Sequence, residues 1–295
     1  MRLLPTLSAL ILSAGAAWSE PPRVVTDILP VQGLVAQVLG DLGSPAVIVS
    51  PGASPHGYAL RPTDARALEQ AELVVWMGPA LAPWLAGSLD TLAPDAPRVV
   101  LMDLPGTTLF EARDWGHEED GEHGHGGTDA HAWLDPENAK LWLGVLAETL
   151  AKADPEHAAE YRANADAGRA GIDAAAAEVQ AAVRALGPAP VLVYHDAFQY
   201  LEHSFGLEVL GAISGEDGAE TGPAQLEALR DAAEARGAHC VLIEPQFSTR
   251  RIDAVFGAGR FDVAVIDPLG TSDAGAPGQY AQMLRGVAAA LADCL

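Results

Sequence analysis

Alternating apolar runs and helical patterns constrain the fold of this chain more than any other feature of its sequence. Most of the runs end in turn residues and lead into a pattern typical of an amphipathic helix. The runs cover residues 22–28, 44–50, 71–78 and 97–103, and then 189–196, 207–213, 239–245 and 261–270. Strands that alternate with helices form parallel sheets with helices on both faces. The sequence therefore predicts an α/β protein with two lobes, each a mostly parallel sheet flanked by helices.

A single long helix is predicted between the two halves. Apolar residues recur at three- and four-residue spacing from His157 to Leu186, Asp154 and Pro155 provide a start signal, and Gly187 a stop. A helix of roughly 30 residues is about 45 Å long, more than one small domain needs. We therefore expect an N-terminal lobe over 20–154, a linker helix over 155–187 and a C-terminal lobe over 188–295. We also expect each lobe to have its own core.

Residues 1–19 have the pattern of a secretory signal peptide. Arg2 precedes a short apolar run, and Ala17 and Ser19 provide small residues before Glu20. The run is short for a membrane anchor, which needs about 20 apolar residues. No cysteine follows the run, which excludes a lipid anchor at the new N-terminus. We expect the mature chain to be free in the periplasm.

The charge balance is strongly acidic. The chain has 40 acidic and 17 basic residues and a net charge of −23, which becomes −24 when Arg2 is removed with the leader. Such a surface argues against binding to nucleic acid or to anionic membranes. It is compatible with attraction of cations.

Two cysteines, Cys240 and Cys294, are present. In an exported protein, a pair of cysteines favours a disulfide. The bond would close a loop of 54 residues and stabilise the fold by about 4 kcal/mol on the chain-entropy model. The alternative is a pair of thiolate metal ligands, although neither cysteine has a neighbouring ligand at metal-binding spacing.

The stretch GHEEDGEHGHGGTDAHAWLDP, residues 116–136, combines four histidines with six carboxylates. This composition is typical of metal binding. A Gly-rich acidic run is also typical of a flexible loop, which we place at 116–130. The histidines are His117, His123, His125 and His131.

The position of each potential ligand relative to the predicted strands separates these histidines. Ligands of parallel sheets bind beyond the carboxyl ends of the strands. His195 and Asp267 each follow an apolar run directly. His56 lies in the loop after the apolar run at 44–50, and His131 precedes a predicted helix start at Asp135. Three imidazoles and one carboxylate form a four-coordinate set suited to zinc, whereas oxygen-rich sites favour manganese.

Five segments carry a resemblance to a known family: SPHGYALRPTDARAL, DAHAWLDPENA, VYHDAFQYLEHSFGLE, CVLIEPQFSTR and IDPLG. They resemble the motifs of the zinc-binding solute receptors of ABC transporters, the ZnuA-like group, in order along the mature chain. The resemblance implies two α/β lobes joined by a long helix, with metal between the lobes. It places ligands at His56, His131, His195 and Asp267.

Further expectations rest on this resemblance alone. Manganese receptors of the group usually have a carboxylate where this chain has His195, so zinc is favoured. Zinc-specific relatives have a disulfide placed like Cys240 and Cys294. The partners implied are a membrane ABC permease and its ATPase. The group often has a His-rich insertion, so His117, His123 and His125 are candidates for a weak secondary site that collects zinc.

The function predicted is therefore a monomeric receptor that binds Zn²⁺ as a transported ligand and is not an enzyme. A periplasmic zinc donor that docks near the His-rich loop is a further possible partner. Zinc affinity should weaken below about pH 6.5, where imidazoles protonate. Three alternatives stay open: a manganese receptor, a zinc hydrolase with Glu244 as base, and a structural zinc protein. No HExxH motif supports the hydrolase, and Glu244 is better explained as support for the fold or for the metal ligands.

Overall fold

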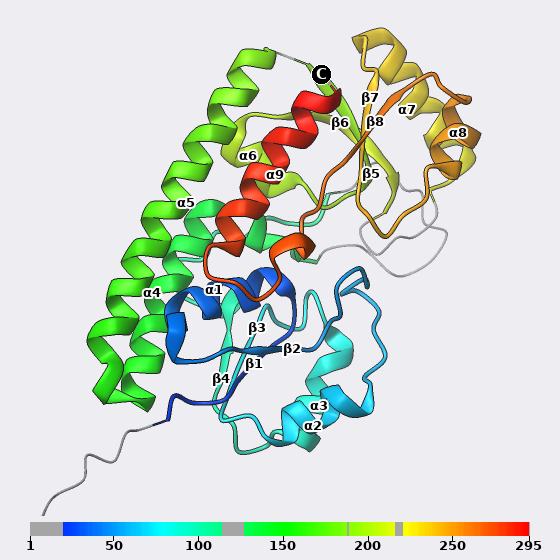
Figure 1. Cartoon of the computed structure of the whole chain (residues 1–295). Helices are drawn as coiled ribbons and strands as arrows, with labels where there is room; N and C mark the ends of the chain where they lie inside the picture. The colour runs from blue at the N-terminus through cyan, green and yellow to red at the C-terminus, as the bar shows by residue number, and fades with distance from the viewer. Residues whose placement is uncertain (1–19, 114–126, 188, 216–220, 295) are drawn as a thin grey trace, which may run out of the picture.

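Two four-stranded parallel sheets form the framework of the protein (Figure 1). The computed structural model describes residues 20–113, 127–187, 189–215 and 221–294. The predicted signal peptide and the loop histidines His117, His123 and His125 lie outside the described residues. The strands are β1 (Val24–Thr26), β2 (Ala46–Val47), β3 (Leu73–Trp76), β4 (Arg98–Val100), β5 (Pro190–His195), β6 (Glu208–Ser214), β7 (Cys240–Ile243) and β8 (Asp262–Val265).

Both sheets have the same topology. Their strand orders are β2-β1-β3-β4 and β6-β5-β7-β8, with Val25 opposite Val74 in the first and Val191 opposite Cys240 in the second. The direction of strand addition therefore reverses between β1 and β3 and again between β5 and β7, which is where open α/β sheets bind ligands. The predicted fold class is confirmed.

Helices cover both faces of each sheet (Figure 1). The α-helices are α1 (Leu29–Leu39), α2 (Pro62–Glu69), α3 (Pro83–Leu92), α4 (Pro136–Ala153), α5 (Ala158–Leu186), α6 (Gln199–Phe205), α7 (Pro223–Arg236), α8 (Arg250–Phe256) and α9 (Gln279–Cys294). Short 3-10 turns are η1 (Gly40–Leu42), η2 (Leu101–Asp103), η3 (Ala132–Leu134), η4 (Pro155–His157) and η5 (Thr271–Asp273).

The long helix predicted between the halves is α5, with 29 residues. It runs along both lobes and packs against α4 and α9 (Figure 1). It ends at Gly187, which has φ 74°, a conformation that glycine adopts without steric cost. Asp154 does not cap α5 by accepting backbone N–H groups, because its Oδ2 instead accepts from Tyr161 Oη at 2.8 Å and His157 Nδ1 at 2.6 Å.

One hydrophobic core passes through both lobes, in addition to the separate core that we expect in each lobe. Alternate strand residues, such as Val75 in β3 and Val193 in β5, belong to the same cluster as the buried face of α5. The opposite faces of the two sheets pack into separate smaller cores under α2 and α3 and under α7 and α8. The long helix therefore joins the lobes through packing as well as through the chain.

Cys240 of β7 and Cys294 of α9 form the predicted disulfide, with their Cα atoms 5.5 Å apart. The bond fastens the last helix to a central strand of the second sheet. Among the described residues, none of the helices has both the length and the apolar composition needed to cross a bilayer.

Candidate metal centre

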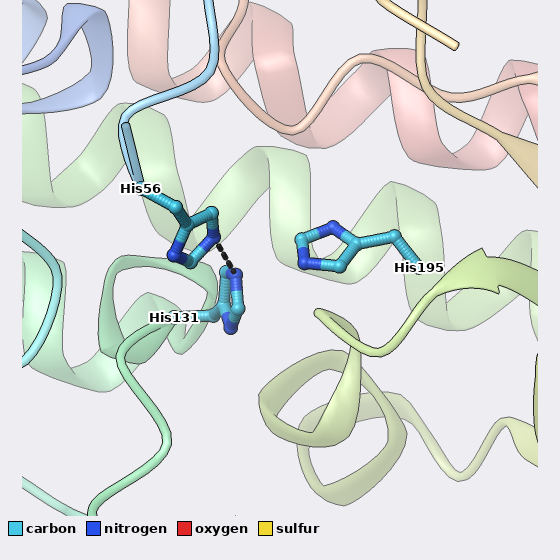
Figure 2. A group of neighbouring side chains, drawn as sticks. All are labelled: His56, His131 and His195. Atoms are coloured by element: carbon cyan, nitrogen blue, oxygen red, sulfur yellow. Dashed lines mark hydrogen bonds between the residues drawn. The ribbon is translucent and has the colours of Figure 1, made fainter. Parts of the chain in front are cut away.

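Three of the four predicted ligands converge at the interface between the lobes. His195 is the last residue of β5, His56 lies in the loop after β2, and His131 directly precedes η3. Figure 2 shows the three rings turned toward a common centre. Among the described residues, this is the group of at least three His, Cys, Asp or Glu side chains whose ligand atoms all lie within 4.8 Å of one another.

The three rings form a nearly equilateral triangle. Their centroids are 5.2 Å apart for His56 and His131, 5.3 Å for His56 and His195, and 5.1 Å for His131 and His195. The Nε2 atoms of His56 and His131 are 3.2 Å apart (Figure 2). His131 and His195 are buried, whereas His56 is half-buried. Nitrogens this close together suit one small cation with bonds of about 2.0 Å.

The loop that carries His56 is held by aromatic side chains. Trp84 Nε1 donates to the Pro55 carbonyl at 2.9 Å, and Tyr58 Oη donates to Asp64 Oδ2 at 3.1 Å. The Tyr58 ring packs beside Trp84. These contacts fix the backbone on both sides of His56, which has no regular secondary structure of its own.

Buried carboxylates contact the other two rings. Asp129 Oδ1 lies 2.8 Å from His131 Nδ1, and Glu244 Oε1 lies 2.7 Å from His195 Nδ1. Burial raises the pKa of the Asp129 carboxyl to about 7. Asp129 is not among the residues predicted from the sequence, whereas Glu244 is expected there to support the fold or the metal ligands rather than to act as a base. Glu244 follows β7 directly, so the rule that selected His195 could also have found it.

A cavity of about 270 Å³ adjoins the three rings. Trp133, Phe247, Pro55, Pro268 and Leu269 supply apolar surface, and Gln246 and Glu244 supply polar atoms. The cavity is far larger than one ion needs, so water or another small ligand can reach the metal position.

Asp267, the fourth predicted ligand, is not part of the histidine cluster. Its Oδ1 accepts from the backbone N–H groups of Leu269 and Gly270, each at 3.1 Å. Its Oδ2 accepts from Thr271 N at 2.7 Å and Thr271 Oγ1 at 2.6 Å. The carboxylate is therefore held by the turn that follows it.

The remaining described histidines lie away from the cluster. His203 is exposed, with its ring 5.0 Å from Phe110. His157 is half-buried against Asp154, and His239 is exposed. None of these three shares the ligand geometry of the converging group.

Several hydrogen bonds join the lobes around the site. Trp133 Nε1 donates to the Pro268 carbonyl at 2.9 Å, and Tyr280 Oη donates to the Trp133 carbonyl at 2.6 Å. Arg113 forms ion pairs with Asp196 and Glu202 beside His195. The segments that carry His131 and His195 are thus fastened to both lobes.

Comparison with known proteins identifies the family. The family model described as ZnuA, zinc-uptake complex component A, periplasmic, matches residues 24–294. The chain belongs to the ZnuA family. It is 39% identical to the high-affinity zinc uptake system protein ZnuA of Paracoccus denitrificans, with 98% of this chain and 96% of that protein covered. The ZnuA family is not an enzyme class.

Solved structures agree with the ZnuA fold. A Zn(II)-bound variant of AdcAII from Streptococcus pneumoniae has a TM-score of 0.77 and 26% identity, with 94% of this chain and 99% of that chain covered. A crystal structure of ZnuA has a TM-score of 0.79 over 93% of this chain and 99% of that chain. Its identity of 24% supports the fold alone.

Proposed function

We propose that this chain is a periplasmic receptor that captures Zn²⁺ with His56, His131 and His195 and delivers it to an ABC permease. The observation that carries the proposal is the convergence of three imidazoles from distant parts of the chain at the lobe interface. The relatives are high-affinity zinc uptake system proteins, which supports zinc as the cargo.

The donor set favours zinc over manganese. Neutral imidazole nitrogens suit zinc, whereas manganese prefers oxygen ligands. Asp267 remains our candidate for the fourth position. Its oxygens are not within 4.8 Å of all three histidine ligand atoms, so ligation brings the carboxylate closer to the rings than it lies here. A water molecule from the adjoining cavity is the alternative fourth ligand.

A zinc hydrolase is the alternative from another class, because catalytic zinc also has three protein ligands and an open position. Glu244, the candidate base, contacts His195 Nδ1 at 2.7 Å. Glu244 Oε1 is therefore occupied by the ring of a metal ligand, which argues against its use as a catalytic base. The family match supports a receptor.

We also propose that residues 1–19 direct export, that the mature receptor acts as a monomer, and that a periplasmic donor can load it. His117, His123 and His125 would form a weaker site that collects zinc. Deletion of residues 117–125 should leave one tight site intact. Isothermal titration calorimetry of the deletion variant with zinc measures the affinity and number of sites. Loss of the tight site would contradict the proposal that the loop histidines form a site separate from the three-histidine centre.

Metal competition tests the receptor function. The purified protein is stripped with a chelator and then offered zinc, manganese and copper together, and the retained metal is measured. We expect one tightly held zinc ion. Preferential retention of manganese would overturn the zinc assignment.

A matched pair of variants tests the site. His131→Ala removes one of three imidazoles and should weaken zinc binding by at least about 100-fold, which is about 2.7 kcal/mol. His203→Ala removes an exposed imidazole outside the cluster and should bind like the unaltered protein. Equal affinity of the two variants would place the zinc elsewhere.

A further inference from the structure

Two of the three ligand rings share one arrangement: a buried carboxylate at Nδ1. The distances are 2.8 Å from Asp129 Oδ1 to His131 and 2.7 Å from Glu244 Oε1 to His195. Asp129 is 4% exposed and Glu244 is 1% exposed. The Asp129 contact lies within a local turn, whereas Glu244 and His195 are 49 residues apart in the chain. Two different local structures therefore place a buried carboxyl oxygen at Nδ1 of a ligand ring.

The carboxylates determine which nitrogen of each ring carries the proton. A carboxyl oxygen that carries no proton only accepts hydrogen bonds, so the Nδ1 it contacts must be the protonated nitrogen. Asp129 Oδ1 is such an oxygen, because it already accepts from the backbone N–H of His131 at 2.9 Å. In a neutral ring the Nε2 atom then has the free lone pair. His131 Nε2 is the atom that lies 3.2 Å from His56 Nε2 at the centre of the cluster (Figure 2).

The carboxylates are themselves held in place. Asp129 Oδ1 also accepts from the backbone N–H of His131 at 2.9 Å, so the ring and its own backbone share one acceptor. Glu244 is the residue directly after β7, and β7 pairs with β5, the strand that ends at His195. Each ring is therefore oriented by a group whose position is set by the backbone.

Glu244 shows that this arrangement is not explained by stability alone. Its Oε2 is buried and has no hydrogen-bond partner among the described residues. A buried carboxylate oxygen without a partner costs desolvation free energy that an apolar side chain would avoid. Its other oxygen contacts His195, and the residue lines the cavity beside the metal position.

We infer that Asp129 and Glu244 are positioning residues that hold His131 and His195 with Nε2 unprotonated and directed at the metal. The inference rests on the proposed function. Carboxylates in this position orient the ring and raise the basicity of the ligand nitrogen, and their loss typically weakens metal binding by about 10- to 100-fold.

The first test needs no zinc. Long-range ¹H–¹⁵N correlation spectra of the metal-free protein with ¹⁵N-labelled histidine distinguish the two tautomers. We expect His131 and His195 to carry their protons on Nδ1. Protonation on Nε2 in the unaltered protein would overturn the inference, whether or not the protein binds zinc.

The second test is a graded pair at one position. Glu244→Gln keeps a carbonyl oxygen that can accept from Nδ1, whereas Glu244→Leu removes the acceptor at similar volume. Zinc affinity should fall by about 10-fold in the first and about 100-fold in the second. Glu244→Leu should also release His195 from the Nδ1-protonated tautomer, which a merely structural role would not produce.

Asp27→Asn is the matched control, because Asp27 is a buried carboxyl that accepts from the Ile28 and Met77 backbone N–H groups. It should keep its zinc affinity within about twofold. Equal losses in Asp27→Asn and Glu244→Leu, or no loss in Glu244→Leu, would refute the positioning role. Failure of the unaltered protein to bind zinc would instead refute the proposed function.

Discussion

At the scale of single residues, hydrogen bonding decides what each carboxylate near the site can do. Asp129 and Glu244 contact ligand rings, whereas Asp267 accepts from its own turn and Asp27 accepts from backbone N–H groups. Carboxylates that look alike in the sequence therefore have different roles, which depend on the donors that surround them.

Asp267→Asn tests the fourth ligand. The amide is a poorer ligand than the carboxylate, so zinc affinity should fall about tenfold or more if Asp267 reaches the metal. Thr271→Val is the control, because it disturbs the same turn by removing the donor at 2.6 Å and leaves the carboxylate. Competition with a chromophoric chelator measures both. Similar affinities in the two variants would favour water as the fourth ligand.

Asp27 should make the stability of the metal-free protein depend on pH. Burial raises the pKa of Asp27 from 3.8 to about 7 in the folded protein. The folded state therefore binds the Asp27 proton more tightly than the unfolded state does. The resulting contribution to the unfolding free energy is fully present below about pH 4 and is lost as pH rises toward 7. The loss is at most about 4 kcal/mol for three pKa units.

Asp27→Asn removes this titration. The difference in unfolding free energy between unaltered protein and variant should fall from pH 4 to pH 7 and then level off. Urea unfolding in the presence of a chelator measures it at each pH. A difference that does not change with pH would contradict the raised pKa.

At the scale of elements, the long helix α5 combines tight contacts with open positions. A Cβ at Gly168 would lie 2.6 Å from Gln37 Cγ and 3.0 Å from Leu143 Cδ1, so α1 and α4 approach the helix closely there. A Cβ at Gly171 would meet nothing within 4 Å. Helix propensity alone gives the two glycines the same penalty.

Two alanine variants separate packing from propensity. Gly171→Ala should raise the unfolding free energy by about 0.5–1 kcal/mol, because alanine loses less backbone entropy in a helix. Gly168→Ala should lower it by about 1–3 kcal/mol, because Gln37 is held by a 2.9 Å hydrogen bond to the Asn164 carbonyl and cannot move freely. Chemical denaturation measures both. Equal stabilisation in the two variants would show that the contact at Gly168 relaxes without cost.

At the scale of the whole molecule, the shared core and the bonds between lobes restrict how the two halves move. The largest core cluster includes residues of both sheets and of α5. Trp133, Tyr280 and Arg113 add polar links across the lobe interface. We therefore expect small shifts of the lobes on metal binding, and hydrogen exchange with and without zinc should show little change along α5.

The metal-free protein should stay folded and unfold in one transition. Its core does not depend on the metal position, and one cluster joins the lobes. Calorimetry of chelated protein should give equal calorimetric and van't Hoff enthalpies. Zinc at 100 times its dissociation constant should add about 2.7 kcal/mol. Two separate transitions would show independent lobes, and unfolding on chelation would indicate a structural zinc protein.

The sequence by itself determined the elements and their order. The eight strands, the long helix and the disulfide follow from apolar periodicity, turn residues and the cysteine pair. The helix start at Asp135 is also as predicted, because Asp135 accepts from the Glu137 backbone N–H. These features depend on residues close together in the chain, or on a pairing with few alternatives.

Only the tertiary structure decided how the site is built. His56, His131 and His195 meet because both sheets pack on the same helices and bring distant loops together. The contact between Glu244 and His195, at 2.7 Å, joins residues 49 positions apart, and no sequence spacing sets it. The shared core likewise arises from packing between lobes, and local periodicity contains no information about that packing.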